Sequence, residues 1–150
     1  MRRYLIVANQ TLGGEKLTQK LDECLRTGPC RFFLAVPVTQ TEGYDYWGSG
    51  TIEGFIPNAH KLATALAQGR LRRELARLHE AGAEAEGEVV EPTPVETIRK
   101  LAEREQVDEI IVSTLPRRLS RWMVADLPHR IKRATGRPTT HIAGAAGPSL

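Results

Sequence analysis

The sequence has few of the residues that mark metal sites, disulfide frameworks and membrane spans. Its two cysteines, Cys24 and Cys30, form no CxxC motif, and its four histidines are scattered along the chain. These spacings argue against a zinc site. The apolar run Tyr4–Ala8 is too short for a signal peptide or a transmembrane helix. We therefore expect a cytoplasmic protein with reduced thiols, no metal and no membrane span.

Aromatic residues are also scarce, at 5% of the chain, and they are not interleaved with basic residues. This argues against nucleic-acid binding. The net charge of +3 is unevenly distributed: residues 84–109 hold nine acids and three bases, whereas residues 113–137 hold seven bases and one acid. The basic region could serve a phosphate ligand, nucleic acid or an acidic partner, or form a solvated helix face. The charge pattern leaves these alternatives open.

Strand and helix patterns alternate through the 150 residues. Apolar runs predict strands near 4–8, 31–38, 83–91, 110–114 and 139–143; helical periodicity predicts helices near 15–27, 58–81, 94–106 and 127–135. Such alternation predicts one α/β domain, residues 1–144, with a parallel sheet between two helical layers. We expect a break or kink near Gly69, an edge strand over 83–91 and a flexible tail over 145–150.

The segment 108–131 organises the chain. Ile110–Val112 predicts a strand that is buried on both faces, with Ser113 and Thr114 at its carboxyl end. Asp126 and Pro128 predict a helix start, because aspartate caps the first amides and proline suits the first turn. Ligands of open parallel sheets bind at the carboxyl ends of strands, so we place the candidate site here.

Hydroxyls and arginines follow this strand, and guanidinium groups suit phosphate or carboxylate. The candidates in this segment are Ser113, Thr114, Arg117, Arg118, Ser120 and Arg121. A carboxylate at the start of the following helix would itself fill the anion site there, which weakens the case for phosphate. The aromatic loop 39–55 could border a ligand, dock a partner, or pack on its own base.

A catalytic function has little support in the sequence. Ser120, Asp126 and His129 are triad residue types, but the chain has no GxSxG nucleophile elbow. The turn Thr11–Gly14 lacks the lysine and the spacing of a P-loop. We expect a protein that is not an enzyme.

These segments resemble the universal stress protein family over nearly the whole chain. YLIVAN (4–9) is similar to the first strand of that family, which usually ends in aspartate, and 108–131 is similar to its fourth strand, glycine loop and last helix, most closely at LSRW (119–122). The combination of SRW and DLPHR looks like a divergent bacterial branch. The resemblance implies an adenine-nucleotide alpha hydrolase-like fold with strand order 3-2-1-4-5, and a homodimer formed through the last strand.

The family's ATP-binding members carry G-x2-G-x9-G followed by Ser or Thr. Ser113 and Pro116 stand at the first two glycine positions, the segment is one residue short, and Ala125–Asp126 replaces the last glycine and hydroxyl. Since glycines let backbone amides approach phosphates, their loss argues against triphosphate binding.

The sequence therefore predicts a non-catalytic, homodimeric universal stress protein-like domain with a degenerate nucleotide crevice. The predicted crevice residues are Asn9, Val38, Ser113, Thr114, Arg117, Arg118, Ser120 and Arg121. No cofactor is firmly predicted; the candidates are an adenine nucleotide, adenosine, another small polar ligand, or none. Two alternatives remain: a genuine ATP or AMP binder in which Arg117, Arg118 and Arg121 hold the phosphates, and a scaffold that binds an acidic partner.

Overall fold

The computed structural model describes residues 1–38, 59–91, 95–116 and 121–148, with residues 59 and 121–126 described by their backbone alone. Five parallel strands form one sheet in the order β3-β2-β1-β4-β5. The strands are β1 (Arg2–Val7), β2 (Cys30–Pro37), β3 (Glu84–Val90), β4 (Glu109–Thr114) and β5 (Thr139–Ala143). The predicted fold class and strand order are confirmed.

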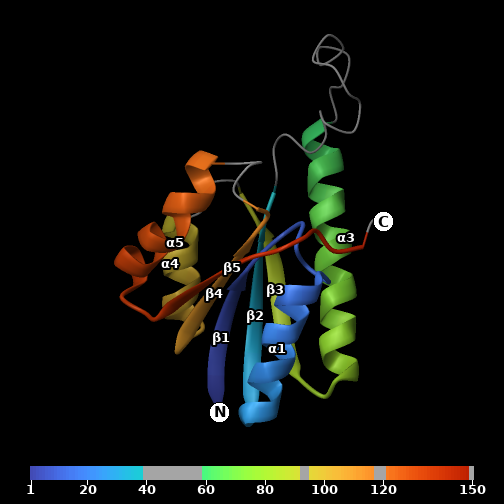
Figure 1. Ribbon diagram of the computed structural model, residues 1–150, viewed down its shortest axis with the longest axis vertical. Coiled ribbons are helices and arrows are strands. Elements are labelled where there is room, and N and C mark those ends of the chain that lie inside the picture. Colours follow the sequence, from blue (N-terminus) through green and yellow to red (C-terminus); the bar gives the residue numbers. More distant parts are fainter. Residues whose placement is uncertain (39–58, 92–94, 117–120, 149–150) are drawn as a thin grey trace.

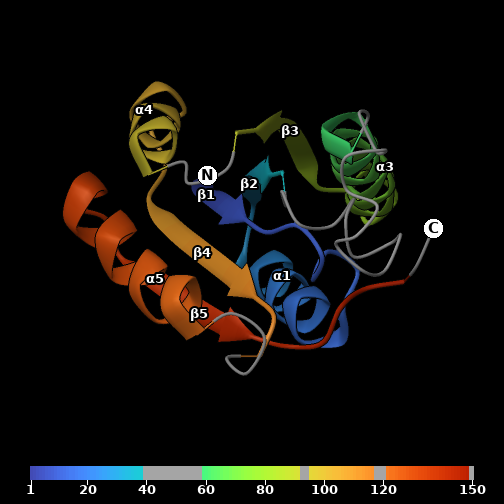
Figure 2. The ribbon, with the colours of Figure 1, turned by 90° about the horizontal axis from the view of Figure 1, so that it is seen from above.

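Helices cover both faces of the sheet (Figures 1 and 2). On one face lie α1 (Glu15–Thr27) and α3 (Ala59–Glu80), and on the other lie α4 (Val95–Arg104) and α5 (Arg121–Thr135). Alternate residues of β1 enter different cores: Tyr4 and Ile6 lie in the core under α1 and α3, whereas Leu5 and Val7 lie in the core under α4 and α5. Strands that are buried on both faces must be apolar throughout, which explains the continuous apolar runs.

Helix α1 has the predicted bounds, and it is bounded by glycine at both ends. Leu17, Leu21 and Cys24 form its buried stripe, and Gly28 ends it with φ of 151°, a backbone conformation that favours glycine. Cys24 and Cys30 are free and buried, and burial raises the pKa of both thiols. Their thiols are therefore protonated at neutral pH and unsuited to act as nucleophiles.

Helix α3 runs without interruption past Gly69, so the expected break is absent, whereas a kink there stays a prediction. Its fully buried positions include Ala63, Ala67 and Leu78. The small alanine side chains let the helix approach the sheet closely, and this packing outweighs the roughly 1 kcal/mol that a glycine costs within a helix. The preceding segment, including the predicted cap Asn58 and the aromatic loop 39–55, lies outside the described residues.

The predicted start of α5 is wrong. The helix begins at Arg121, so Asp126 is its sixth residue and Pro128 lies in its interior. Asp126 therefore does not occupy the helix amino terminus. A proline within a helix removes one backbone hydrogen bond. The burial of Ile131 in the core under α4 and α5, with the partly buried Leu127 packed against that core, offsets this loss.

The carboxyl-terminal tail crosses the turn that precedes α1 and runs toward α3 (Figures 1 and 2). The backbone N–H of Gly147 donates to the carbonyl oxygen of Gln10 at 2.7 Å. A Cβ atom on Gly147 would lie 1.8 Å from the carbonyl oxygen of Leu12, so only glycine permits this approach. The described part of the tail, up to Pro148, therefore packs on the turn; the flexibility expected for 145–150 stays a prediction.

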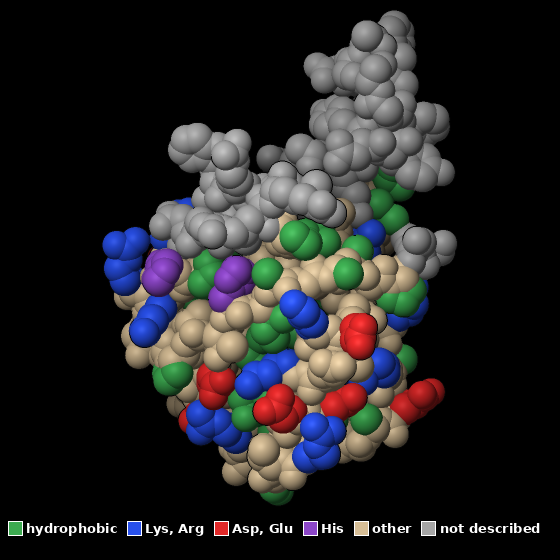
Figure 3. Space-filling view, in the orientation of Figure 1, with side chains coloured by type: hydrophobic (Ala, Val, Ile, Leu, Met, Phe, Trp, Pro, Cys, Tyr) green, Lys and Arg blue, Asp and Glu red, His purple; other side chains and the backbone are tan. Residues whose placement is uncertain are grey.

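Charged side chains of both signs are mixed over the lower part of the face seen in Figure 3, whereas basic and histidine side chains gather near α5 and β5. The acidic residues of β3 lie at the opposite edge of the sheet, where charge discourages pairing with another strand. Among the described helices, none combines the length and the apolar character needed to cross a membrane.

Candidate functional site

The candidate site lies where β1 and β4 end side by side. The connection after β1 leads to α1 on one face of the sheet, and the connection after β4 leads to α5 on the other (Figure 2). The connections after these two neighbouring strands therefore leave the sheet on opposite faces. Such a topological switch point is the usual place for a ligand in an open α/β sheet. Asn9 follows β1, and Ser113 and Thr114 end β4.

A hydrogen bond between two buried hydroxyls joins the ends of β1 and β4. The Oγ1 atom of Thr11 and the Oγ atom of Ser113 are 2.7 Å apart, and the two residues are 2% and 5% exposed. A buried hydroxyl needs such a partner, because leaving it without one costs free energy. The bond thus fixes the turn after β1 against the end of β4.

The side-chain amide of Asn9 forms hydrogen bonds through both its nitrogen and its oxygen. Its Nδ2 atom donates to the carbonyl oxygen of Pro37 at 2.7 Å, and its Oδ1 atom accepts from Nη1 of Arg70 at 3.0 Å. The side chain therefore links the end of β2 to α3. A ligand that used the donor or the acceptor of this amide would have to compete with these contacts.

Val38 and Thr114 complete the described part of the predicted site. Val38 is buried, and its N–H donates to the carbonyl oxygen of Val90 at 2.9 Å. It follows Pro37, whose carbonyl oxygen accepts from Asn9. Thr114 is half-buried, and its Oγ1 atom lies 2.7 Å from Nε2 of His141 on β5. Its hydroxyl thus contacts the edge strand.

The remaining predicted residues are not placed. Arg117, Arg118 and Ser120 lie outside the described residues, and Arg121 is the first residue of α5 with only its backbone described. The triad hypothesis for Ser120, Asp126 and His129 is untested for the same reason. Within the described ranges, no group of three metal-ligating side chains is close enough to hold an ion.

Two residues of the site were not predicted from the sequence. In the sequence, Thr11 stands out only as part of the turn Thr11–Gly14, although it lies in the same connection after β1 as Asn9. Arg70 lies within α3, and no local motif distinguishes it from its neighbours Arg72 and Arg73. Its contact with Asn9 depends on how α3 packs against the sheet.

The strand order, the two helical layers and the switch point define the fold of the universal stress proteins, and solved structures share it. Hypothetical protein MJ0577 matches with a TM-score of 0.70 and 16% identity, covering 95% of both chains. Universal stress protein UspA from Lactobacillus plantarum matches with a TM-score of 0.68 and 11% identity, covering 94% of this chain and 97% of its own.

A universal stress protein family protein from Arabidopsis thaliana, solved with AMP bound, matches with a TM-score of 0.61 and 13% identity, covering 97% of this chain and 94% of its own. Comparison with protein-family models and with curated protein sequences finds no match. The similarity therefore lies in the fold.

Proposed function

We propose that this chain is a divergent universal stress protein that is not an enzyme and whose nucleotide crevice is degenerate. The observation that carries this proposal is the state of Asn9, which stands where the family usually has aspartate. Both ends of its amide are engaged, by Pro37 and by Arg70. The buried hydroxyls of Thr11 and Ser113 likewise bond to each other. The polar groups at the ends of β1 and β4 stabilise the fold, and these contacts oppose the binding of a nucleotide.

The sequence after β4 supports the same proposal. Ser113, Pro116, Ala125 and Asp126 occupy the positions of the family's phosphate-binding glycines and hydroxyl. A loop without glycine brings fewer backbone amides close to a phosphate, and proline has no amide to offer. This loop would therefore bind the phosphate groups of a nucleotide weakly.

The alternative function is binding of an adenine nucleotide. The Arabidopsis protein of the same fold was solved with AMP, which favours this alternative. In this chain Arg117, Arg118 and Arg121 would replace the missing backbone amides, because guanidinium groups bind phosphate in a fork. A titration distinguishes the two functions.

We expect no binding heat when ATP or AMP is titrated into the protein by calorimetry, with or without magnesium. The reason is the combination of an engaged Asn9 and a phosphate loop without glycine. Adenosine, which needs no phosphate contact, serves as the comparison ligand. Micromolar ATP binding that is lost in Arg117→Ala/Arg118→Ala but kept in Arg133→Ala would overturn the proposal in favour of the arginine-dependent alternative. Arg133 is a suitable control because it is exposed on α5.

We further propose that two copies pair through β5. This strand is at the edge of the sheet. The N–H of Ile110 donates to the carbonyl oxygen of Pro138, and the N–H of Gly144 donates to that of Thr114. The backbone N–H and C=O groups of the even-numbered residues therefore point toward β4. The backbone groups of Thr139, His141 and Ala143 therefore point away from the sheet. An edge strand is a template for pairing with another strand. The carbonyl oxygen of Ala143 accepts from Nζ of Lys16 at 3.3 Å, so a second copy would displace that contact at this end of β5.

Ala143→Pro is expected to convert the dimer to a monomer in analytical ultracentrifugation. The substitution removes an outward N–H but leaves the bonds between β4 and β5 intact, and edge strands tolerate proline. Ala143→Ser keeps the N–H and is expected to remain dimeric. A native protein that sediments as a single chain at micromolar concentration would contradict the pairing, and so would an Ala143→Pro variant that remains dimeric.

A further inference from the structure

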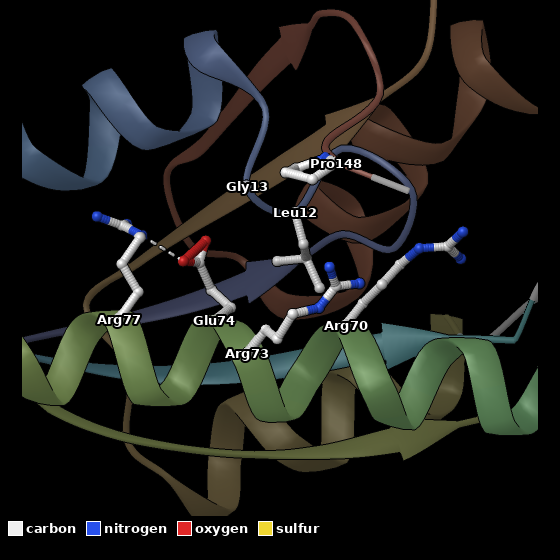
Figure 4. A pocket seen from close by; sticks show the side chains of 7 residues that line it. All are labelled: Leu12, Gly13, Arg70, Arg73, Glu74, Arg77 and Pro148. Carbon is white, nitrogen blue, oxygen red and sulfur yellow. Dashed lines mark hydrogen bonds and ion pairs between the residues drawn. The ribbon is translucent and has the colours of Figure 1, made fainter. Parts of the chain in front are cut away.

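A hollow lies on the α3 side of the molecule, and it shares Arg70 with the candidate site. Its volume is about 190 Å³, and it is lined by residues of α3, of the turn after β1 and of the carboxyl-terminal tail. The lining residues are Leu12, Gly13, Arg70, Arg73, Glu74, Arg77 and Pro148 (Figure 4). None of the predicted crevice residues that the structure describes lines it.

Three arginines and one glutamate supply the polar part of this hollow. Arg70, Arg73 and Arg77 rise from the same side of α3, at a spacing of three and four residues (Figure 4). Arg73 is exposed, whereas Glu74 is 3% exposed. The hollow therefore runs from a cationic surface to a buried carboxylate, with a formal charge that favours an anion.

Two atoms at the buried end have unused hydrogen-bonding capacity. Nε of Arg77 donates to Oε1 of Glu74 at 2.5 Å. Within the described part of the chain, no group hydrogen-bonds Oε2 of Glu74 or Nη2 of Arg77, although both atoms are buried. The carboxylate oxygen requires a donor and the guanidinium nitrogen requires an acceptor. A ligand that satisfied both groups would donate to the carboxylate and accept from the guanidinium.

We propose that this hollow binds inorganic phosphate as hydrogenphosphate. This anion accepts hydrogen bonds from guanidinium groups through its oxygens, and its single P–OH group donates to Oε2 of Glu74. The volume suits a small anion, since pockets for drug-sized ligands measure about 300–1,000 Å³. Sulfate has the same tetrahedral shape but carries no proton at neutral pH. A sulfate oxygen next to Oε2 of Glu74 would be repelled by the carboxylate, so the site should bind hydrogenphosphate more tightly than sulfate.

Calorimetric titration of the full chain with sodium phosphate and with sodium sulfate, at neutral pH and constant ionic strength, tests this proposal. We expect phosphate to bind at least about tenfold more tightly than sulfate, since a hydrogen bond to a charged group separates them. Arg73→Gln should weaken phosphate binding about tenfold. Arg72→Gln is the matched control, because Arg72 is exposed on the same helix and does not line the hollow. It should bind phosphate as the native protein does.

Glu74→Gln distinguishes a ligand contact from a structural role. Its amide can donate to sulfate, so we expect the preference for phosphate over sulfate to fall toward one. Thermal unfolding in chloride buffer verifies that each variant is folded before titration. The proposal is overturned if the folded native protein shows no phosphate binding, if phosphate and sulfate bind equally, or if Arg72→Gln weakens binding as much as Arg73→Gln does. A folded Glu74→Gln variant that keeps the native preference would also overturn it.

Discussion

Replacing Arg77 with methionine is expected to lower the free energy of unfolding by about 3 kcal/mol, measured by urea denaturation. The side chain of Glu74 is 2% exposed and pairs with Arg77, which also lies 3.4 Å from Asp22 on α1. Removing the arginine leaves a buried carboxylate without its partner, a change that costs about 3–5 kcal/mol in other proteins. We expect the lower end of this range, because Arg70 and Arg73 line the same hollow.

The double variant Glu74→Leu/Arg77→Met should recover most of this loss. It removes both charges together, and replacing a buried ion pair by apolar residues of similar volume is often neutral. Arg72→Met, the same substitution at an exposed position five residues earlier on α3, should change the free energy by no more than about 0.5 kcal/mol. The single variant Glu74→Leu completes the comparison. A double variant whose loss equals the sum of the losses from Glu74→Leu and Arg77→Met would contradict the coupling of Glu74 and Arg77.

The fold could be predicted from the sequence because its signals are local. Ile110–Val112 reads as a buried strand, and the structure buries all three residues completely between two helical layers. Helix α1 was predicted with its observed bounds because Gly28 and Pro29 follow a regular apolar stripe. Alternation of such elements leaves few arrangements for a parallel sheet.

The contacts of the candidate site could not be predicted in the same way, because they join distant parts of the chain. Thr11 and Ser113 are 102 residues apart, and Asn9 and Arg70 are 61 apart. Glu74 lies in a polar stretch of sequence, and only the packing of α3 reveals that it is buried. The start of α5 was misplaced for a related reason: the preference of proline for a first turn is weaker than the packing of Ile131 and Leu127.

Gly87→Val is expected to lower the free energy of unfolding by about 3 kcal/mol, the upper end of the range for overpacking. Gly87 lies on β3 beside Leu34 of β2 and beneath Leu71 of α3. A Cβ atom at this position would lie 2.6 Å from the carbonyl oxygen of Leu34 and 2.7 Å from Cδ1 of Leu71. The leucine side chain can rotate away, but the carbonyl oxygen belongs to the backbone of a paired central strand. The added atoms therefore separate β3 from β2 or displace the chain locally.

Glu84→Val on the same strand is the matched control. Glu84 is exposed at the start of β3, and valine suits a strand, so its free energy of unfolding should stay within about 0.5 kcal/mol of the native value. A difference between the two valine variants isolates the close approach at Gly87 from the general effect of placing valine on β3. Equal denaturation midpoints would mean that β3 and α3 adjust to the side chain. Glycine at this position would then be dispensable, and the packing of α3 that brings Arg70 to Asn9 would not depend on it.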